Sequence, residues 1–138
     1  MRAQEMIATH PDMRGEPASP LVRCIEECYV CAQVCTSCAD ACLAEPGVEQ
    51  LRQCIRLDLD CADICLAAGA LASRRTGSNS DVLAQLLQAC RSACSRCAQE
   101  CEQHATLHEH CRICGESCRH CERACHDAIQ DITSATAH

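Results

Sequence analysis

The sequence predicts an all-α fold: an antiparallel up-and-down four-helix bundle, preceded by a short extra helix at the N-terminus. Three observations support this prediction. Cysteine and aliphatic residues recur at helical spacing through four stretches of about 24–28 residues. Short segments containing Pro, Gly, Ser or Asn separate these stretches, and no extended alternation of apolar and polar residues favours strands. Long helices joined by short loops pack as antiparallel neighbours.

The N-terminal part of the chain contains the short helix and then the first long one. The stretch RAQEMIATH, residues 2–10, suits a short helix, and residues 10–19 form a Pro-interrupted linker. Ser19 is a favourable N-cap, and Pro20 suits the first helical position. We therefore expect the first long helix to span residues 20–43.

Breaks in the pattern define the next two helices. Residues 45–47, Glu-Pro-Gly, end the first long helix, and a second runs over about residues 48–74. Gly77 is a candidate C-cap for this helix. Residues 78–81, Ser-Asn-Ser-Asp, place a Ser three residues before an acid. This capping-box pattern opens a third long helix that ends near Gln103.

The fourth long helix begins with a similar pattern. Residues 106–109, Thr-Leu-His-Glu, predict its start, and we expect it to end near Ile132. The chain then divides into an N-terminal helix and linker over residues 1–18, a cysteine-lined bundle over residues 19–134 and a tail over residues 135–138. A chain of 138 residues suits one such domain and is long enough to bury a core.

Cysteine occupies nearly every core position of the predicted bundle. In the first long helix, six cysteines follow gaps of four, three, four, three and four residues, the spacing of positions that face a bundle axis. The other helices carry cysteine on the same face, with Asp58 at one such position of the second. The predicted metal ligands on this face are Cys24, Cys28, Cys31, Cys35, Cys38, Cys42, Cys54, Cys61, Cys65, Cys90, Cys94, Cys97, Cys101, Cys111, Cys114, Cys118, Cys121 and Cys125.

The composition and net charge argue against partners of two kinds, nucleic acids and membranes. The net charge is −7, and the twelve basic residues are scattered arginines, which argues against nucleic acid because binding it needs a basic patch. The N-terminus shows no apolar signal region, and no stretch reaches membrane-spanning length. We therefore expect a cytoplasmic protein without a membrane partner, in a compartment that keeps thiols reduced.

Packing, disulfides and catalysis explain the cysteines poorly. Cys is smaller than Leu, so thiols alone leave the bundle axis underfilled. Residues three or four apart in a helix have Cβ atoms about 5–6 Å apart, whereas a disulfide needs about 3.5–4.5 Å. Disulfides between helices stay open, although a reducing compartment disfavours them. The C-x-x-C pairs lie mid-helix, and no nucleophile or acid–base pair stands apart from the repeat, so we expect no enzyme.

Metal binding explains the pattern best. Thiolates select Cu(I), Zn(II) or iron–sulfur clusters. Zinc and iron–sulfur sites need four ligands around one centre, whereas a straight helix presents its thiols in a line. Cu(I) needs only two or three thiolates, and thiolates bridge neighbouring ions, which predicts roughly 18 Cu(I) ions per chain. A general thiolate buffer for Zn(II) or Cd(II) and a thiol redox sensor are the alternatives.

The two ends of the predicted bundle differ in chemistry. One end brings together the start of the first long helix, the loop near residue 77 and the end of the fourth. It collects aliphatic side chains that form an apolar plug, namely Leu21, Val22, Leu71, Leu83, Leu86, Leu87, Ile129 and Ile132. Metal is therefore expected to enter at the opposite end.

That opposite end is rich in histidine. His104 continues the cysteine face of the third helix, and His108 and His110 follow at the start of the fourth. We expect these three imidazoles to form a mouth that binds copper weakly and passes it to the thiols, although His108 and His110 equally suit a solvated surface. Asp58, one turn inside the second helix, is a further candidate ligand.

The stacked C-x-x-x-C and C-x-x-C motifs, such as CIEECYVCAQVCTSCADAC over residues 24–42, resemble those of the bacterial copper storage proteins. The resemblance covers about residues 19–132 and is strongest to the cytosolic type. It implies a four-helix bundle that takes many Cu(I) ions into its lumen, a homotetramer, and His rather than Met at the mouth. It also implies copper ions, with a small-molecule or protein copper donor, as the partners.

Outside the cysteine face, the first long helix carries further apolar residues. Ile25, Tyr29, Val30 and Val34 form more apolar surface than a monomeric bundle needs. We expect the N-terminal helix to cover part of this surface and a neighbouring chain to cover the rest.

Overall fold

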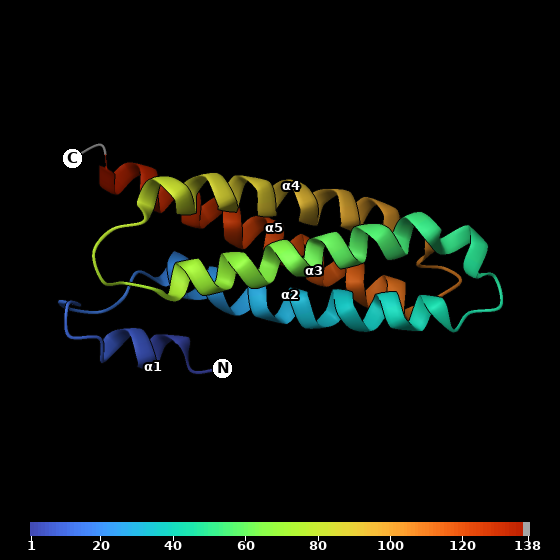
Figure 1. The fold of residues 1–138 in the computed structure, drawn as a ribbon, viewed down its shortest axis with the longest axis horizontal. Helices are drawn as coiled ribbons and strands as arrows, with labels where there is room; N and C mark the ends of the chain where they lie inside the picture. Colours follow the sequence, from blue (N-terminus) through green and yellow to red (C-terminus); the bar gives the residue numbers. More distant parts are fainter. Residues whose placement is uncertain (137–138) are drawn as a thin grey trace.

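The computed structural model describes residues 1–136 and confirms the all-α bundle; the described residues contain no strand. Figure 1 shows four long helices that run alternately up and down, with the short α1 beside the start of α2. Each long helix packs against two others, which closes the bundle around one axis. The elements are α1 (Ala3–Ala8), α2 (Ser19–Leu43), the 3-10 helix η1 (Val48–Leu51), α3 (Arg52–Ser73), α4 (Ser80–His104) and α5 (Glu109–Thr136).

The two predicted capping boxes do not form. The helix α4 begins at Ser80 after Asn79, without a side-chain cap. Asn79 instead donates its side-chain amide to the carbonyl of Leu71, 3.0 Å away, and so ties the start of α4 to the end of α3. The helix α5 begins only at Glu109, where the carbonyl of His108 accepts the first helical bond. In both places, hydrogen bonds set by the connection replaced the local cap that the sequence pattern favours.

The remaining helix boundaries differ from the prediction by a few residues. The predicted second helix is divided, because residues 48–51 form 3-10 turns before α3 begins. Gly77 has φ of +67°, a left-handed conformation that favours glycine. It lies beyond the end of α3, so it turns the loop rather than capping the helix. The helix α5 continues past Ile132 to Thr136, and the end of the predicted tail, with His138, lies outside the described residues.

The antiparallel order of the helices places different connections at the two ends of the bundle. We call the end with the α3–α4 loop the closed end and the end with the α2–α3 and α4–α5 connections the mouth (Figure 1). At the closed end, Leu83 and Leu87 are fully buried, and Ile7 of α1 joins the same core. His10 Nε2 lies 3.0 Å from Thr76 Oγ1 and ties the N-terminal segment to the α3–α4 loop. The predicted apolar plug thus lies beneath the N-terminal segment.

The outer apolar surface of α2 is smaller than the sequence suggests. Ile25 is buried at 1% exposure, and the ring of Tyr29 lies on the backbone of Gly69 in α3. A Cβ atom at residue 69 would lie only 2.9 Å from Tyr29 Cε2, so glycine permits this close approach. Val30 stays 43% exposed. Within the described residues, none of the helices is both long and apolar enough to cross a membrane.

Candidate metal centre

The cysteines form a continuous column of sulfur along the bundle axis. All eighteen are free thiols, and none is more than 1% exposed. They arise from the inner faces of all four long helices, as the heptad-like spacing predicts. Apart from Asp58, the axis between the closed end and the mouth is therefore lined by sulfur, and we call this arrangement the sulfur column.

Neighbouring thiols in the column lie in contact. Within one helix, the sulfur atoms of Cys31 and Cys35 are 3.8 Å apart. Between helices, Cys35 and Cys118 approach to 3.6 Å, and Cys65 lies 3.7 Å from Cys90. The sulfur atoms therefore fill the axis by touching one another, without disulfide bonds.

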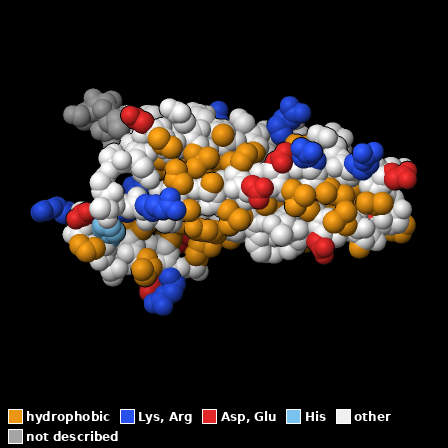
Figure 2. All heavy atoms as spheres, viewed as in Figure 1, with side chains coloured by type: hydrophobic (Ala, Val, Ile, Leu, Met, Phe, Trp, Pro, Cys, Tyr) orange, Lys and Arg blue, Asp and Glu red, His pale blue; other side chains and the backbone are white. Residues whose placement is uncertain are grey.

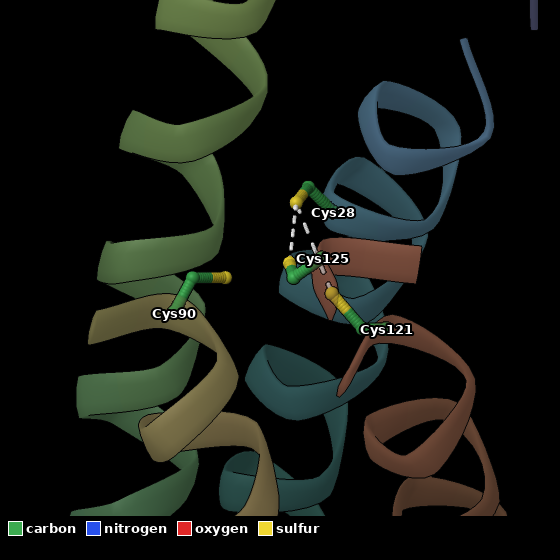
Figure 3. Close-up of side chains that lie close together, drawn as sticks. All are labelled: Cys28, Cys90, Cys121 and Cys125. Carbon is green, nitrogen blue, oxygen red and sulfur yellow. Dashed lines mark hydrogen bonds between the residues drawn. The ribbon is translucent and has the colours of Figure 1, made fainter. Parts of the chain in front are cut away.

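Groups of four thiols converge on common points. In each of the groups named at the end of this paragraph, the four sulfur atoms lie within 4.8 Å of one another. Figure 3 shows one of them, in which Cys28, Cys121 and Cys125 meet on one side and Cys90 points toward them from α4. The groups include Cys28/Cys90/Cys121/Cys125, Cys31/Cys65/Cys94/Cys121, Cys31/Cys35/Cys61/Cys118, Cys35/Cys97/Cys114/Cys118 and Cys38/Cys42/Cys54/Cys111.

This convergence revises one step of the sequence analysis. A single helix does present its thiols in a line, but the second group above takes one cysteine from each of the four long helices. A metal–sulfur bond of about 2.3 Å places the sulfurs of a trigonal or tetrahedral site about 3.8–4.0 Å apart, and those of a linear site about 4.6 Å apart. The observed contacts of 3.6–4.0 Å fit sites with three or four thiolates directly. Linear sites need small side-chain rotations.

Asp58 interrupts the sulfur column. Its side chain has no exposed surface, and its Oδ1 accepts from the thiols of Cys97 at 3.1 Å, Cys114 at 3.2 Å and Cys101 at 3.6 Å. Burial, followed by repulsion from Cys97, raises the pKa of Asp58 to about 10. The carboxyl group is therefore protonated at neutral pH, and a soft cation nearby would favour its ionised form.

Burial also raises the pKa of two thiols near the mouth, those of Cys42 and Cys111. Desolvation, with repulsion from Cys38, raises the pKa of Cys111 to about 12. The pKa of Cys42 is raised above its ordinary value by the same causes. The copper-free thiols of Cys42 and Cys111 therefore carry protons at neutral pH, so a metal ion that binds them must displace those protons.

The mouth brings one histidine directly onto the column. His110 Nδ1 lies 3.5 Å from the sulfur of Cys38, 3.9 Å from that of Cys42 and 3.6 Å from that of Cys111. Burial lowers the pKa of His110, but its contacts with Cys38 and Glu45 outweigh burial and raise the pKa overall. This imidazole and three thiols form a mixed nitrogen–sulfur site.

Glu45 organises the mouth, although no sequence motif marks it as a functional residue. Its carboxylate oxygens lie 3.2 Å from His110 Nε2 and 3.5 Å from His108 Nδ1. The two imidazoles stack, with ring centres 5.4 Å apart. A carboxylate that holds the outer nitrogen of a ligating histidine orients the inner nitrogen toward the metal. The only sequence signal was its place in the turn at the histidine-rich end.

The other histidines contribute less to this site. His104 pairs with Glu100, 3.0 Å away on its own helix, and no contact between His104 and a thiol is seen in the described part of the chain. His108 stands behind His110. His120 and His126 fall off the cysteine face and are exposed, and His126 Nδ1 lies 2.7 Å from Arg91 Nη1.

Known proteins are similar to this chain in fold and in sequence. The copper storage protein family matches residues 18–130. A copper storage protein from Streptomyces lividans, loaded with 10 copper equivalents, is 50% identical and superposes with a TM-score of 0.89, over 93% of this chain and 98% of that one. A further structure of the cytosolic copper storage protein from Streptomyces lividans, with five coppers, is 54% identical, has a TM-score of 0.79 and covers 80% and 92% of the two chains.

A curated bacterial protein is also similar. An uncharacterized cysteine-rich protein of Bacillus subtilis, YhjQ, is 37% identical over 102 residues, which is 74% of this chain and 89% of that protein. Cysteine-rich sequences similar to this chain therefore occur in at least two bacterial genera.

Proposed function

The chain belongs to the copper storage protein family, and we propose that it stores Cu(I) along the sulfur column, with about one ion for each cysteine. The single observation that carries this proposal is the column itself. Its eighteen buried thiols lie in contact, so one thiolate can bind two neighbouring ions. Cys31, Cys35, Cys118 and Cys121 each belong to two of the four-sulfur groups. Because each of these thiolates can bridge two ions, the number of bound ions can exceed the number of separate four-sulfur groups.

The charge balance of the buried column favours Cu(I) when one ion binds for each cysteine. One singly charged ion for each thiolate leaves the buried column without net charge, whereas a Zn(II) ion with four thiolates leaves two negative charges in the interior. A buried charge without a partner is costly. The Zn(II) or Cd(II) buffer is therefore the weaker alternative.

Anaerobic titration of the reduced protein with Cu(I) tests the proposal. We expect saturation near 18 ions per chain, because the column holds 18 thiols, with release of about one proton per thiol. Metal analysis and pH-stat measurement give the two numbers. Saturation at one to four ions would contradict storage, and preferential retention of Zn(II) in a competition would favour the buffer.

We also propose that the mouth receives copper through His110. The imidazole lies against three thiols and is oriented by Glu45. The variant His110→Ala is expected to slow copper uptake while leaving the final capacity within one or two ions of the wild type. His104→Ala is the matched control, since His104 faces Glu100. Stopped-flow absorbance of copper–thiolate bands measures both, and a collapse of capacity in His110→Ala would make His110 a core ligand.

We further propose a cytosolic homotetramer that stores rather than transforms its copper. The cytosolic description of the Streptomyces lividans relative supports the location. For assembly, Val30 of α2 and Leu59 and Leu66 of α3 are 43–48% exposed, and Figure 2 shows hydrophobic side chains gathered along this face. A face of this kind is typical of a protein interface.

The oligomer is tested by charge substitution on that face. The double variant Leu59→Glu with Leu66→Glu is expected to sediment as a smaller species than the wild type, because two carboxylates would be buried in the interface. Val82→Glu is the control, since Val82 is 61% exposed at the start of α4. Equal masses for the wild type and the double variant would place the interface elsewhere.

A further inference from the structure

Three sets of three thiols form closed triangles inside the sulfur column. In each set, every sulfur atom lies 3.6–4.0 Å from the other two. Two of the cysteines stand one turn apart on the same helix, and the third comes from the antiparallel neighbour. We call these sets the thiol triangles, and they are Cys24/Cys28/Cys125, Cys31/Cys35/Cys118 and Cys61/Cys65/Cys94.

The geometry of a thiol triangle follows from the helix period and from helix packing. In the triangle of Cys31, Cys35 and Cys118, the edges are 3.8, 3.8 and 3.6 Å. The spacing of four residues on α2 sets the first edge, and the packing of α2 against α5 sets the other two. Figure 3 shows Cys28 and Cys125 of another triangle pointing toward each other in the same way. The three sulfurs of a triangle can therefore bind one atom together after small side-chain rotations.

The surroundings of the thiol triangles disfavour net charge. All nine cysteines are 0% exposed, and their side-chain contacts in the described part of the chain are with other thiols. A buried charge without a partner is costly. One Cu(I) or Zn(II) ion bound by three thiolates leaves negative charge in the triangle, whereas an atom that supplies three positive charges leaves none.

We propose that the copper-free protein also binds trivalent arsenic, with one arsenic atom on each thiol triangle. The inference goes beyond copper storage and rests on the triangles themselves. Trivalent arsenic is soft, as are the thiolate ligands of the column. It takes three ligands on one side and keeps a lone pair on the other, so it forms a pyramid on a triangle of sulfur atoms. Its form in neutral solution, As(OH)₃, is uncharged.

Binding is a ligand exchange without oxidation or reduction. Each of the three arsenic–oxygen bonds of As(OH)₃ breaks as a bond from arsenic to a cysteine Sγ forms. The proton of each thiol leaves with the released hydroxide as water, so three water molecules depart and arsenic stays trivalent. Three thiols and uncharged arsenous acid give an uncharged product, and the interior of the bundle gains no charge.

Anaerobic titration of the reduced, copper-free full chain with sodium arsenite tests the proposal. We expect three tightly bound arsenic atoms per chain, one for each thiol triangle. Native mass spectrometry counts the arsenic atoms, and the mass gained with each atom shows whether three thiol protons were lost. Sodium arsenate is the control ligand and is expected not to bind, because its arsenic must first be reduced.

Breaking all three triangles tests whether their geometry is responsible. The triple variant Cys24→Ser, Cys31→Ser and Cys61→Ser removes one sulfur from each triangle. Its affinity for arsenite is expected to fall at least about tenfold, because the third bond of each site forms at high effective concentration. Competition with dithiothreitol, a chelator with two thiols, measures the affinity.

A matched control removes three thiols from outside the triangles. The triple variant Cys54→Ser, Cys101→Ser and Cys111→Ser has the same number of thiols as the broken variant and keeps all three triangles. It is expected to bind three arsenic atoms with the wild-type affinity. Circular dichroism checks that both variants keep their helices, and the count for the wild type decides the proposal even if one of them does not.

The outcomes separate arsenic binding from copper storage, since Cu(I) capacity is measured on the same preparations. A wild type that takes up about 18 Cu(I) ions, one for each thiol, but no arsenic would overturn the inference and leave storage standing. Equal loss of arsenite affinity in the two triple variants would show that thiol number matters and the triangles do not. Three bound arsenic atoms with a capacity of only a few copper ions would overturn storage alone.

Discussion

Saturation with Cu(I) is expected to raise the thermal unfolding midpoint of the reduced protein by at least about 30 °C. A ligand at 1,000 times its dissociation constant stabilises the folded state by about 4 kcal/mol per site. One kcal/mol shifts the midpoint of a chain of this size by about 3 °C. Three or four tightly held ions therefore suffice, and the column offers many more positions.

The structural reason is that copper would crosslink helices whose axis is now filled mainly by contacts between thiols. The group of Cys31, Cys65, Cys94 and Cys121 takes one ligand from each long helix, so ions there would tie the whole bundle together. In the copper-free protein, cysteine replaces the larger aliphatic residues that usually hold a bundle core. Copper-free protein is thus expected to unfold at a modest temperature.

Circular dichroism at 222 nm, recorded during heating with zero to eighteen equivalents of Cu(I), measures the effect. Mg²⁺ is the control, because a hard cation prefers oxygen ligands and should leave the midpoint unchanged. A second control replaces the four cysteines of that group by serine, which removes the ligands shared by all four helices. A flat thermal response of the wild type to Cu(I) would show that the ions bind outside the core.

The cysteine face was predictable because heptad spacing depends only on the helix period. All eighteen predicted thiols do face the axis. The spacing does not reveal which thiols lie at the same level, since that depends on how far each helix slides along its neighbours. The four-sulfur groups, such as the one centred on Cys31 and Cys94, therefore appear only in three dimensions.

The histidines show why the mouth was harder to predict. His104 continues the cysteine face in the sequence, but its ring turns to Glu100, one helical turn earlier. His110 lies beside Cys111, off that spacing, yet it reaches Cys38 and Cys42. Helical side chains lean toward the N-terminus, and His110 stands in the first turn of α5, so its ring extends over the open end. Glu45, from a different connection, then fixes the ring.

Asp58 could be placed on the axis from the sequence, but its protonation state could not. The spacing indicates a mouth carboxylate, one turn inside the second helix. The structure shows a fully buried group surrounded by the thiols of Cys54, Cys97, Cys101 and Cys114. Because no basic side chain is among these partners, burial dominates and the pKa rises to about 10.

The copper-free protein is therefore expected to lose stability as the pH rises, because Asp58 is held protonated only in the folded state. Its pKa moves from an ordinary 3.8 to about 10 on folding. The folded state thus binds more protons than the unfolded state between these values. The contribution is fully present below about pH 4 and is lost at about 1.4 kcal/mol per pH unit, the value for one proton, as the pH rises toward 10. His110, whose pKa is also raised, acts in the same direction.

The variant Asp58→Asn isolates the effect of Asp58, because an amide has nearly the same shape, accepts from the same thiols and does not titrate. Urea unfolding at pH 5 and at pH 8 keeps the thiols of the unfolded chain largely protonated, since their pKa is about 8.5. Over this interval the free energy of unfolding of the wild type is expected to fall by about 4 kcal/mol more than that of Asp58→Asn. Parallel pH profiles for the two proteins would show that Asp58 is ionised in the folded state, with water or an unrecognised cation supplying its charge partner.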